Sequence, residues 1–419
     1  MSNLESVEHF GGRATTPATL DRPDVDSGAG LPQPASPASP SAVHPLPRMR
    51  VLRDITDRAV FEEVLSRGRV TRAELSTATG ISKPTISDAV RRMGERGILV
   101  ETGFRTGRRG RVATYYELAR DSGWVLAIEL DADGINVSAA GLCGTVFGDG
   151  HRPLPADRAR LVHAVNAAVR RQQKAANDRG PLRVVAVSVA NPVDPTRSDV
   201  LSVPSWPSPD NRLSVRSIFG DLGATQVLVD NDVNLAAQAE REIGVARNAS
   251  SFGYFYVGTG LGYAFHHGDQ LIRGARGLTG EIGRLPTGPG RDVTALQALI
   301  RLGFGRPDGT TLDVACIHEA LDRARAGDPT ADRQVDALCE VLVMAVAAIN
   351  AVNDPELFVI GGPLGRHSLL FERLRSSVAR HHPFAAPMAA SSLDGPVALR
   401  GAMLRALADG REMLMRRVA

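Results

Sequence analysis

The segment from residue 121 to residue 419 alternates short apolar runs with longer amphipathic patterns, and this alternation constrains the fold most. The longest runs have the lengths of strands, and each is followed by a polar or Gly-rich turn. Strands that alternate with helices form α/β folds, which bind ligands at the carboxyl ends of their strands. The predicted strands are Val125–Leu130, Val137–Leu142, Val184–Val189, Val227–Val229, Phe252–Val257 and Leu357–Ile360, and the predicted helices are Leu161–Ala176, Asp232–Ile243 and Asp332–Asn353.

A different pattern occupies residues 51–120. Apolar residues from Val51 to Leu65 recur at helical spacing, and Gly68 ends this first helix. Thr71-Arg-Ala-Glu74 is a capping box that starts a second helix, and Ser82 can cap a third helix that runs to about Arg96. Strands at Ile98–Glu101 and Ala113–Leu118 follow. Three helices and a β-hairpin predict a winged helix-turn-helix domain.

The charge of the chain gathers in this same segment. Residues 50–120 carry 15 basic and 9 acidic groups, a net charge of +6, whereas the whole chain carries only +3. A basic module beside a nearly neutral body is typical of a nucleic-acid-binding protein. The loop between the two strands, Thr102–Arg111, could instead be a solvated charged turn. The capped helices before it make this interpretation less favoured. We predict DNA contacts from the start of the third helix and from this loop, namely Ser82, Lys83, Thr85, Ser87, Arg105, Arg108, Arg109 and Arg111.

Residues 1–50 are expected to form a disordered tail. They hold 8 of the 26 prolines, interleaved with Ala and Ser, and too little apolar surface to offset the entropy of ordering. Met49 directly precedes the first helical pattern, so translation could start there instead of at Met1. No signal sequence is evident, and the best uninterrupted apolar run, Val341–Ala348, is too short to cross a membrane. Three scattered cysteines favour neither a disulfide framework nor a cysteine zinc site. We expect a cytoplasmic protein.

The run from Arg72 to Ser87, with Gly107-Arg-Arg-Gly-Arg111, resembles the N-terminal domain of the ROK (repressor, open reading frame, kinase) transcriptional regulators. The body is similar to the ROK body over nearly all of residues 121–419. The resemblance implies a two-lobed actin-like ATPase (ribonuclease H-like) fold, an effector-binding and dimerising body, and a homodimer or higher homo-oligomer on a palindromic operator. The matching stretches are Asn191-Pro-Val-Asp194, Val227–Asn234, Gly258-Thr-Gly-Leu-Gly262, Gly274–Gly283, Ile349-Asn350 with Asp354-Pro355, and Ile360-Gly-Gly362.

The resemblance also assigns roles to single residues. It implies that Asn231, Asp232 and Glu281 contact a sugar, where Asp232 would be the catalytic base of a kinase. Helix capping alone is the competing interpretation of Asn231 and Asp232, and a tight hairpin turn is that of Thr259–Gly262. The family's Gly-His is here Gly283-Arg284, so Arg284 is a candidate substitute for the sugar-contacting histidine.

Several departures from the family pattern favour a regulator over a kinase. A ROK kinase opens with an Asp followed by Gly-Gly-Thr, which cradles phosphates. The aligned stretch here is Ile128-Glu-Leu-Asp131-Ala-Asp133-Gly134, with Asp131 and Asp133 where the family has glycine and threonine. Carboxylates there oppose nucleotide binding. Residues 285–302 contain neither Cys nor His, so the family's zinc loop is absent. We therefore predict a DNA-binding regulator of carbohydrate genes, acting as a repressor, without enzyme activity, cofactor or metal.

Two other hypotheses stay open. One is an active sugar kinase that carries an attached regulatory module, since Asp232 and Gly258–Gly262 are retained. The other is a regulator that has lost its effector site and responds to a partner protein.

Overall fold

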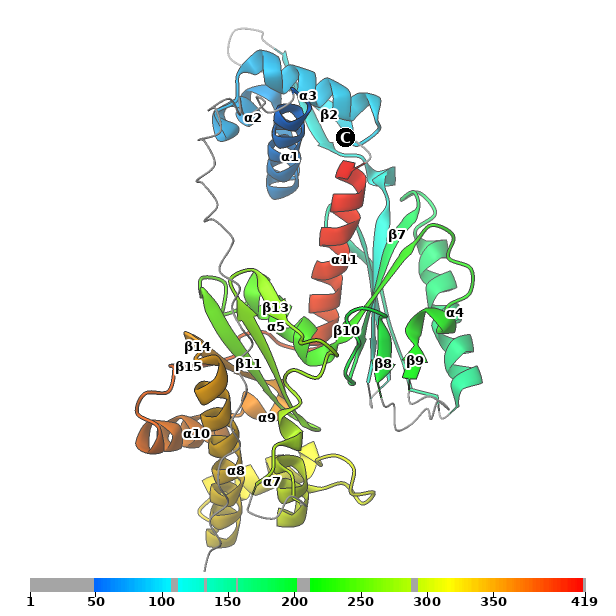
Figure 1. The fold of residues 1–419 in the computed structure, drawn as a ribbon. Coiled ribbons are helices and arrows are strands. Elements are labelled where there is room, and N and C mark those ends of the chain that lie inside the picture. Colours follow the sequence, from blue (N-terminus) through cyan, green and yellow to red (C-terminus); the bar gives the residue numbers. More distant parts are fainter. Residues whose placement is uncertain are drawn as a thin grey trace, which may run out of the picture. The chain divides into compact units, whose positions relative to one another are not determined.

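The computed structural model describes residues 49–106, 112–131, 134–155, 157–201, 212–287 and 293–416. The chain divides into two units, Met1–Leu46 and Pro47–Ala419. The first unit, which holds most of the predicted tail, lies outside the described residues. The elements of the second unit are drawn in Figure 1.

The first part of this unit is a winged helix-turn-helix, as predicted. Its helices are α1 (Met49–Arg67), α2 (Arg72–Thr79) and α3 (Lys83–Glu95), and its three-stranded sheet has the order β1 (Val70–Thr71), β3 (Val112–Leu118), β2 (Leu99–Thr106). The capping box of Thr71 and Glu74 is present, and Ser82 caps α3 through the backbone N–H of Thr85. Gly80 ends α2 with a φ of 70°, a conformation that glycine adopts without steric cost. The predicted helix boundaries are therefore correct to within about two residues.

The wing differs from the sequence prediction in one respect. The strand expected to end at Glu101 continues as β2 to Thr106. A bulge shifts its register with β3 between Glu101 and Phe104. Gly103 lies in this bulge with a φ of 132°. An extra residue in one strand disturbs the alternation of side chains, so the sequence pattern fades there although the strand goes on.

The body opens with a five-stranded sheet of order β10-β7-β4-β5-β6, in which β4, β7 and β10 are parallel. Alternate residues of β4 face opposite ways: Val125 and Ala127 pack with the C-terminal helix α11, whereas Leu126 and Ile128 pack with α4. Figure 1 shows these two helices on opposite faces of the sheet. Its elements are β4 (Trp124–Leu130), β5 (Ile135–Gly141), β6 (Val146–Arg152), α4 (Arg158–Ala175), β7 (Leu182–Val189), β10 (Gln226–Asn231), α5 (Asp232–Ile243) and α11 (Val397–Arg416). A separate pair, β8 (Asp199–Leu201) and β9 (Arg212–Ser214), follows β7.

A second five-stranded sheet repeats this arrangement, with the order β13-β12-β11-β14-β15. Again three strands are parallel and two are antiparallel, so the body consists of two similar halves. This two-sheet architecture agrees with the two-lobed, actin-like fold that the resemblance implied. Its elements are β11 (Ser251–Val257), β12 (Leu261–His267), β13 (Gln270–Ile272), α6 (Ala295–Leu299), α7 (Val314–Arg325), α8 (Pro329–Asn353), β14 (Leu357–Gly361), α9 (Gly362–Gly365), α10 (Ser368–His381) and β15 (Met388–Ala390).

Helix α8 corrects the expectation about membrane-spanning segments. Among the described residues, it is one helix long and apolar enough to cross a bilayer, judged by length and composition alone. Its buried side chains, such as Leu338, Leu342 and Val346, belong to the core beneath the second sheet, where α8 packs between α7 and α10. The sequence shows no uninterrupted apolar run of this length, because Asp336 and Glu340 lie within the helix. Core packing thus accounts for the buried part of its apolar surface, about 44% of its most apolar stretch.

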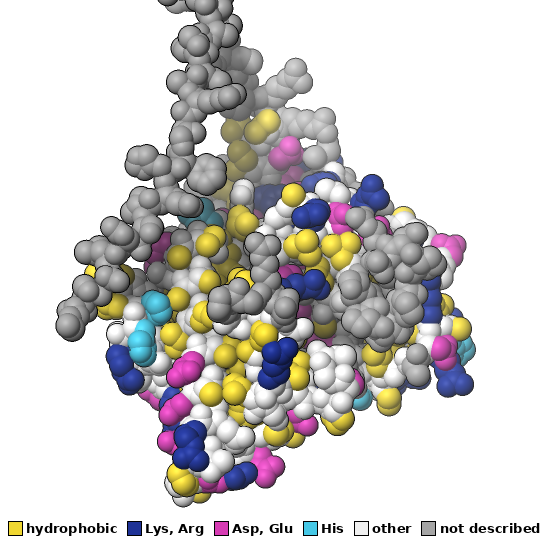
Figure 2. All heavy atoms as spheres, turned by 60° about the horizontal axis from the view of Figure 1, so that its bottom comes forward, with side chains coloured by type: hydrophobic (Ala, Val, Ile, Leu, Met, Phe, Trp, Pro, Cys, Tyr) yellow, Lys and Arg dark blue, Asp and Glu magenta, His cyan; other side chains and the backbone are white. Residues whose placement is uncertain are grey.

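The surface of the body carries charges of both signs. On the face shown in Figure 2, basic and acidic side chains are interspersed and do not gather by sign. This agrees with the net charge of −1 that the sequence assigns to residues 121–419.

Candidate functional site

Three parallel strands of the first sheet end at one cavity. β4 leads to Asp131, β7 leads to Asn191, and β10 ends at Asn231, and all three of these residues line a cavity of about 1080 Å³. The second sheet contributes the turn between β11 and β12 and the segment that follows β14. The carboxyl ends of parallel strands are where an α/β sheet presents its loops, which explains why residues far apart in the sequence meet here.

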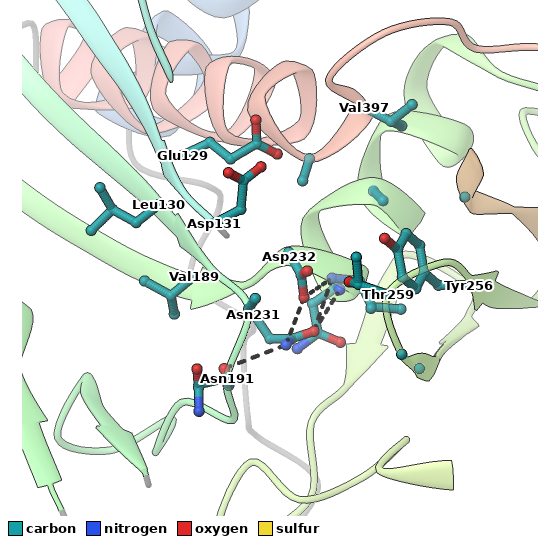
Figure 3. Close-up of a pocket in the computed structure, with 18 of the residues that line it drawn as sticks. Glu129, Leu130, Asp131, Val189, Asn191, Asn231, Asp232, Tyr256, Thr259 and Val397 are labelled. Carbon is teal, nitrogen blue, oxygen red and sulfur yellow. Dashed lines mark hydrogen bonds between the residues drawn. The ribbon is translucent and has the colours of Figure 1, made fainter. Parts of the chain in front are cut away.

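Asn231 both caps a helix and organises the cavity wall. Its Oδ1 accepts hydrogen bonds from the backbone N–H groups of Val233 (2.9 Å) and Asn234 (3.2 Å), the first turn of α5. Its Nδ2 donates to Asp232 Oδ1 (2.9 Å) and to the carbonyl oxygen of Asn191 (3.3 Å). Figure 3 shows these bonds at the β10–α5 junction. The capping interpretation is thus correct for Asn231, and it is compatible with a place in the cavity wall.

Asp232 is held in an environment that disfavours its charge. Burial and the neighbouring charges of Glu281 and Asp131 raise the pKa of Asp232 to about 7, while the backbone N–H of Val233 opposes the shift. Burial also raises the pKa of Glu281, against the effect of Arg284. A carboxyl group with a pKa near 7 can accept a hydrogen bond from a hydroxyl when ionised and donate one when protonated.

Further carboxylates enter the cavity from β4. Glu129 is only 7% exposed and accepts a hydrogen bond from Asn136 Nδ2 (3.2 Å), and Asp131 Oδ1 accepts one from the backbone N–H of Gly134 (2.8 Å). Figure 3 shows both side chains at the end of this strand, apart from the Asn231–Asp232 pair. Asp133, which we also expected to oppose phosphate, lies outside the described residues. The acidic lining suits hydroxyl-rich ligands and disfavours phosphates.

The turn between β11 and β12 is a tight hairpin that also lines the cavity. Gly258 N–H donates to the carbonyl oxygen of Gly260 (3.1 Å), and the ladder resumes at the pair Val257 and Leu261. Thr259 and Gly260 both face the cavity. Nearby, Tyr256 has its pKa raised to about 12 by burial and, secondly, by the charge of Asp232. The hairpin interpretation of this glycine-rich segment is therefore correct, and the segment also belongs to the site.

The structure brings together three of the four predicted effector residues. Asn231, Asp232 and Glu281 line the cavity, and their role as effector contacts stays a prediction. Arg284 is placed differently: its side chain is 70% exposed, and its Nε lies 3.7 Å from Glu281 Oε2, outside the described lining of the cavity. One helical turn separates the two residues, and the arginine side chain extends from that turn into solvent. The role of Arg284 as a substitute for the family's histidine stays a prediction.

The residues present do not fit the structural zinc of the family. Residues 285–302 carry neither Cys nor His, and part of this segment forms α6, which begins with a capping box of Thr294 and Gln297. Within the part of the chain that the structure describes, no cluster of three metal-ligating side chains is found. Cys143 and Cys316 are exposed, and Cys339 is buried in the core.

The predicted DNA contacts are located only in part. Ser82, Lys83 and Thr85 are exposed at the start of α3, while Ile86, Ala89, Val90 and Met93 are buried on its other side. Ser87, one turn further, is half-buried. The backbone of Arg105 belongs to β2, but its side chain lies outside the described residues, as do Arg108, Arg109 and Arg111.

Some residues of the cavity were missed at the level of sequence. Glu129 had a usable signal, because it is the one charged residue in the otherwise apolar strand β4. Tyr256 had none, since an aromatic residue in a strand is typical of a core. Arg366 and Thr310 also line the cavity, and they come from segments with no distinguishing pattern.

Fold and site together define a winged-helix protein whose two-lobed, kinase-like body contains a cavity lined by carboxylates, amides and apolar side chains. The chain belongs to the ROK family, whose sequence profile matches residues 125–405. A winged helix-turn-helix DNA-binding profile matches residues 53–100.

Comparison with individual proteins gives the same family. The chain is 23% identical to the xylose repressor of Bacillus subtilis over 237 residues, which are 56% of this chain and 61% of that protein. Among solved structures, a ROK family transcriptional regulator described as a homologue of the E. coli MLC protein superposes with a TM-score of 0.65 at 20% identity, covering 88% of this chain and 99% of that one. The ROK hexokinase of Thermus thermophilus gives 0.56 at 26% identity, over 69% of this chain and 99% of that one.

Proposed function

We propose that this protein is a sugar-responsive transcriptional repressor of carbohydrate genes. The observation that carries the proposal is the presence, on one chain, of a winged helix-turn-helix and a ROK body whose cavity is lined in part by carboxylates and amides. The start of α3 would contact operator DNA, and Asn231, Asp232 and Glu281 would hold hydroxyl groups of the effector. The similarity to xylose repressors supports a sugar as the effector and makes D-xylose the first compound to test.

The body senses its ligand in this proposal and does not transfer phosphate. The turn after β4 presents the carboxylate of Asp131 to the cavity where ROK kinases have glycine and threonine, and Glu129 adds a second negative group. Negative charge at this position repels the phosphates of a nucleotide. The same reasoning favours an unphosphorylated sugar as the effector.

The effector acts by shifting an equilibrium between two arrangements of the DNA-binding modules. It must bind one arrangement more tightly than the other, because a ligand with equal affinity for both shifts nothing. We propose a cytoplasmic homodimer on a palindromic operator, in which the separation of two α3 helices sets the affinity for DNA.

A sugar kinase is the second candidate. Asp232 at the start of α5, the Thr259–Gly260 turn in the cavity wall, and the similarity to the Thermus thermophilus hexokinase favour it. A coupled assay of ATP turnover with a sugar panel separates the two functions. Turnover that needs both a sugar and Asp232, and disappears in Asp232→Asn, would establish the kinase.

The repressor is tested by a mobility-shift titration with DNA from upstream of the protein's own gene. We expect a shift that weakens with salt, competes poorly with unrelated DNA, and is reversed by one sugar of the panel. A protein that shifts specific DNA but responds to no sugar would instead support control by a partner protein. Absence of any sequence-preferring shift would refute the proposal.

A further inference from the structure

The carboxylate of Asp230 gathers three segments behind the cavity wall. Its Oδ1 accepts hydrogen bonds from the backbone N–H of Asn231 (2.9 Å) and from Asn234 Nδ2 (2.9 Å). Its Oδ2 accepts two more from Arg273, through Nε (2.9 Å) and Nη2 (2.6 Å). Asp230 itself is not among the described residues that line the cavity. It therefore acts on the site through its neighbours.

Arg273 stands at the start of the loop that carries Glu281. The loop leaves β13 at Arg273, and its far end is fixed where Tyr263 N–H donates to the carbonyl oxygen of Gly280 (3.0 Å). Gly277 and Gly280 have φ values of 71° and 92°, and a side chain at either position would meet a backbone carbonyl oxygen. The loop thus lies close against its surroundings at its middle and its end. The ion pair with Asp230 fixes its beginning.

The Asp230–Arg273 ion pair is a strong, directional contact, because two guanidinium N–H groups donate to one carboxylate. Both side chains are mostly buried, so water screens them less than it screens a surface pair. His266 lies close to both charges, but burial lowers its pKa to about 4. It is therefore neutral near pH 7 and adds no competing positive charge.

We propose that the Asp230–Arg273 ion pair is a positioning element, which holds the Glu281 loop in register with the Asn231–Asp232 turn so that both can contact one effector. This inference rests on the proposed function for its ligand, but not for its structural part. The Asp230 carboxylate accepts a hydrogen bond from the backbone N–H of Asn231 on one side. On the other side it accepts hydrogen bonds from Arg273, at the start of the Glu281 loop. Loss of the pair therefore separates the two halves of the effector site without removing any contact residue.

The variant Asp230→Asn isolates the Arg273 arm. An asparagine Oδ1 can still accept from Asn231 and Asn234, but its amide group cannot accept from a guanidinium. Arg273→Gln removes the other partner, and Arg273→Lys keeps the charge while losing the two-pronged geometry. A matched control is Asp269→Asn, which breaks an Asp–Arg pair with Arg241 (2.7 Å) at the β12–β13 turn, where Asp269 is 95% exposed.

The first measurement is hydrogen–deuterium exchange of the full-length protein without ligand. We expect faster exchange in residues 273–284 for Asp230→Asn and Arg273→Gln, a smaller change for Arg273→Lys, and none for Asp269→Asn. Unchanged exchange in this loop for both disruptive variants would overturn the inference. This outcome does not depend on whether any sugar binds.

The second measurement is calorimetric titration with D-xylose, D-glucose and D-galactose, well below the melting temperature of each variant. For a sugar that binds the wild type, we expect about 10-fold weaker binding for Asp230→Asn and for Arg273→Gln, and about the same loss in the double variant, because a charged hydrogen-bonded pair acts as a unit. Arg273→Lys should recover part of the affinity. Additive losses, or unchanged affinity despite a loosened loop, would refute the positioning role. Failure of the wild type to bind any sugar would count against the proposed function, while the exchange result would still decide the ion pair's structural role.

Discussion

The raised pKa of Asp232 predicts that the protein gains stability when this carboxylate is removed, and that the gain depends on pH. An unfolded aspartate has a pKa near 3.9, whereas Asp232 titrates at about 7 in the folded chain. Between these values the folded protein keeps a proton that the unfolded chain has lost. The free energy of unfolding contributed by Asp232 therefore falls as the pH rises, and levels off above pH 7. Asp232→Asn cannot titrate and escapes this fall.

The magnitude follows from the size of the shift. From pH 5 to pH 8 the fall spans about two pKa units, which at ~1.4 kcal/mol per unit sets an upper bound of ~2.7 kcal/mol. Burial is the main cause of the shift, but Asp232 lines the cavity and is only half-buried, so screening by solvent reduces this to about 1–1.5 kcal/mol. For a body of about 300 residues we expect the melting temperature of Asp232→Asn, relative to wild type, to rise by ~1.5–2.5 °C between pH 5 and pH 8.

Thermal unfolding of both proteins at pH 5, 6, 7 and 8, followed by circular dichroism, measures this difference. Asp269→Asn serves as the control, because its carboxylate is 95% exposed, and its melting temperature should track the wild type at every pH. At pH 8 the same Asp232→Asn variant should bind sugar about 10-fold to 100-fold more weakly, since a charged hydrogen-bond acceptor is lost. A stability difference that stays constant from pH 5 to pH 8 would refute the reasoning about Asp232.

Three further predictions concern the DNA-binding domain. Lys83→Ala should weaken operator binding and lower the slope of log K against log salt by about 1, if Lys83 contacts one phosphate, which a salt series of mobility shifts would detect. Asp57→Asn should destabilise the domain by about 1–3 kcal/mol, because the buried Asp57 of α1 accepts hydrogen bonds from Arg92 of α3. Chemical denaturation measures this loss. A loss no larger than that of Asp88→Ala, which breaks an exposed ion pair, would contradict this prediction. Thr71→Ala removes the N-cap of α2 and should cost ~1 kcal/mol in the same assay, whereas the exposed Thr77→Ala in the same helix should cost less.

The winged helix-turn-helix could be predicted almost completely from local chemistry. A capping box at Thr71, an N-cap at Ser82 and a left-handed glycine at Gly80 are each decided by residues within one helical turn. Such interactions need no tertiary partner, so the sequence pattern states them directly. The bulge at Gly103 could not be predicted in this way, because it depends on how β2 pairs with β3.

The residues of the cavity likewise differ in whether the sequence could predict them. Asn231 and Asp232 could be found because they join a strand to a helix, where polar residues are conspicuous. The exposure of Arg284 could not be predicted, because a position in a sequence motif does not determine where a long, flexible side chain points. Asp230 and Arg273 lie 43 residues apart, and no pattern in either segment announces their ion pair.

The sequence by itself determined the order of the domains, the α/β class of the body, and the concentration of positive charge in residues 50–120. These follow from periodicity, capping and composition, all of which are local or additive properties. The tertiary structure decided which carboxylates share the cavity, how far the pKa of Asp232 rises, and which residues stand behind the contact residues. Those properties depend on distances between segments far apart in the chain, and burial sets their strength. The fold and part of the site therefore follow from local properties of the chain, while the electrostatics of the site depend on the assembled sheets.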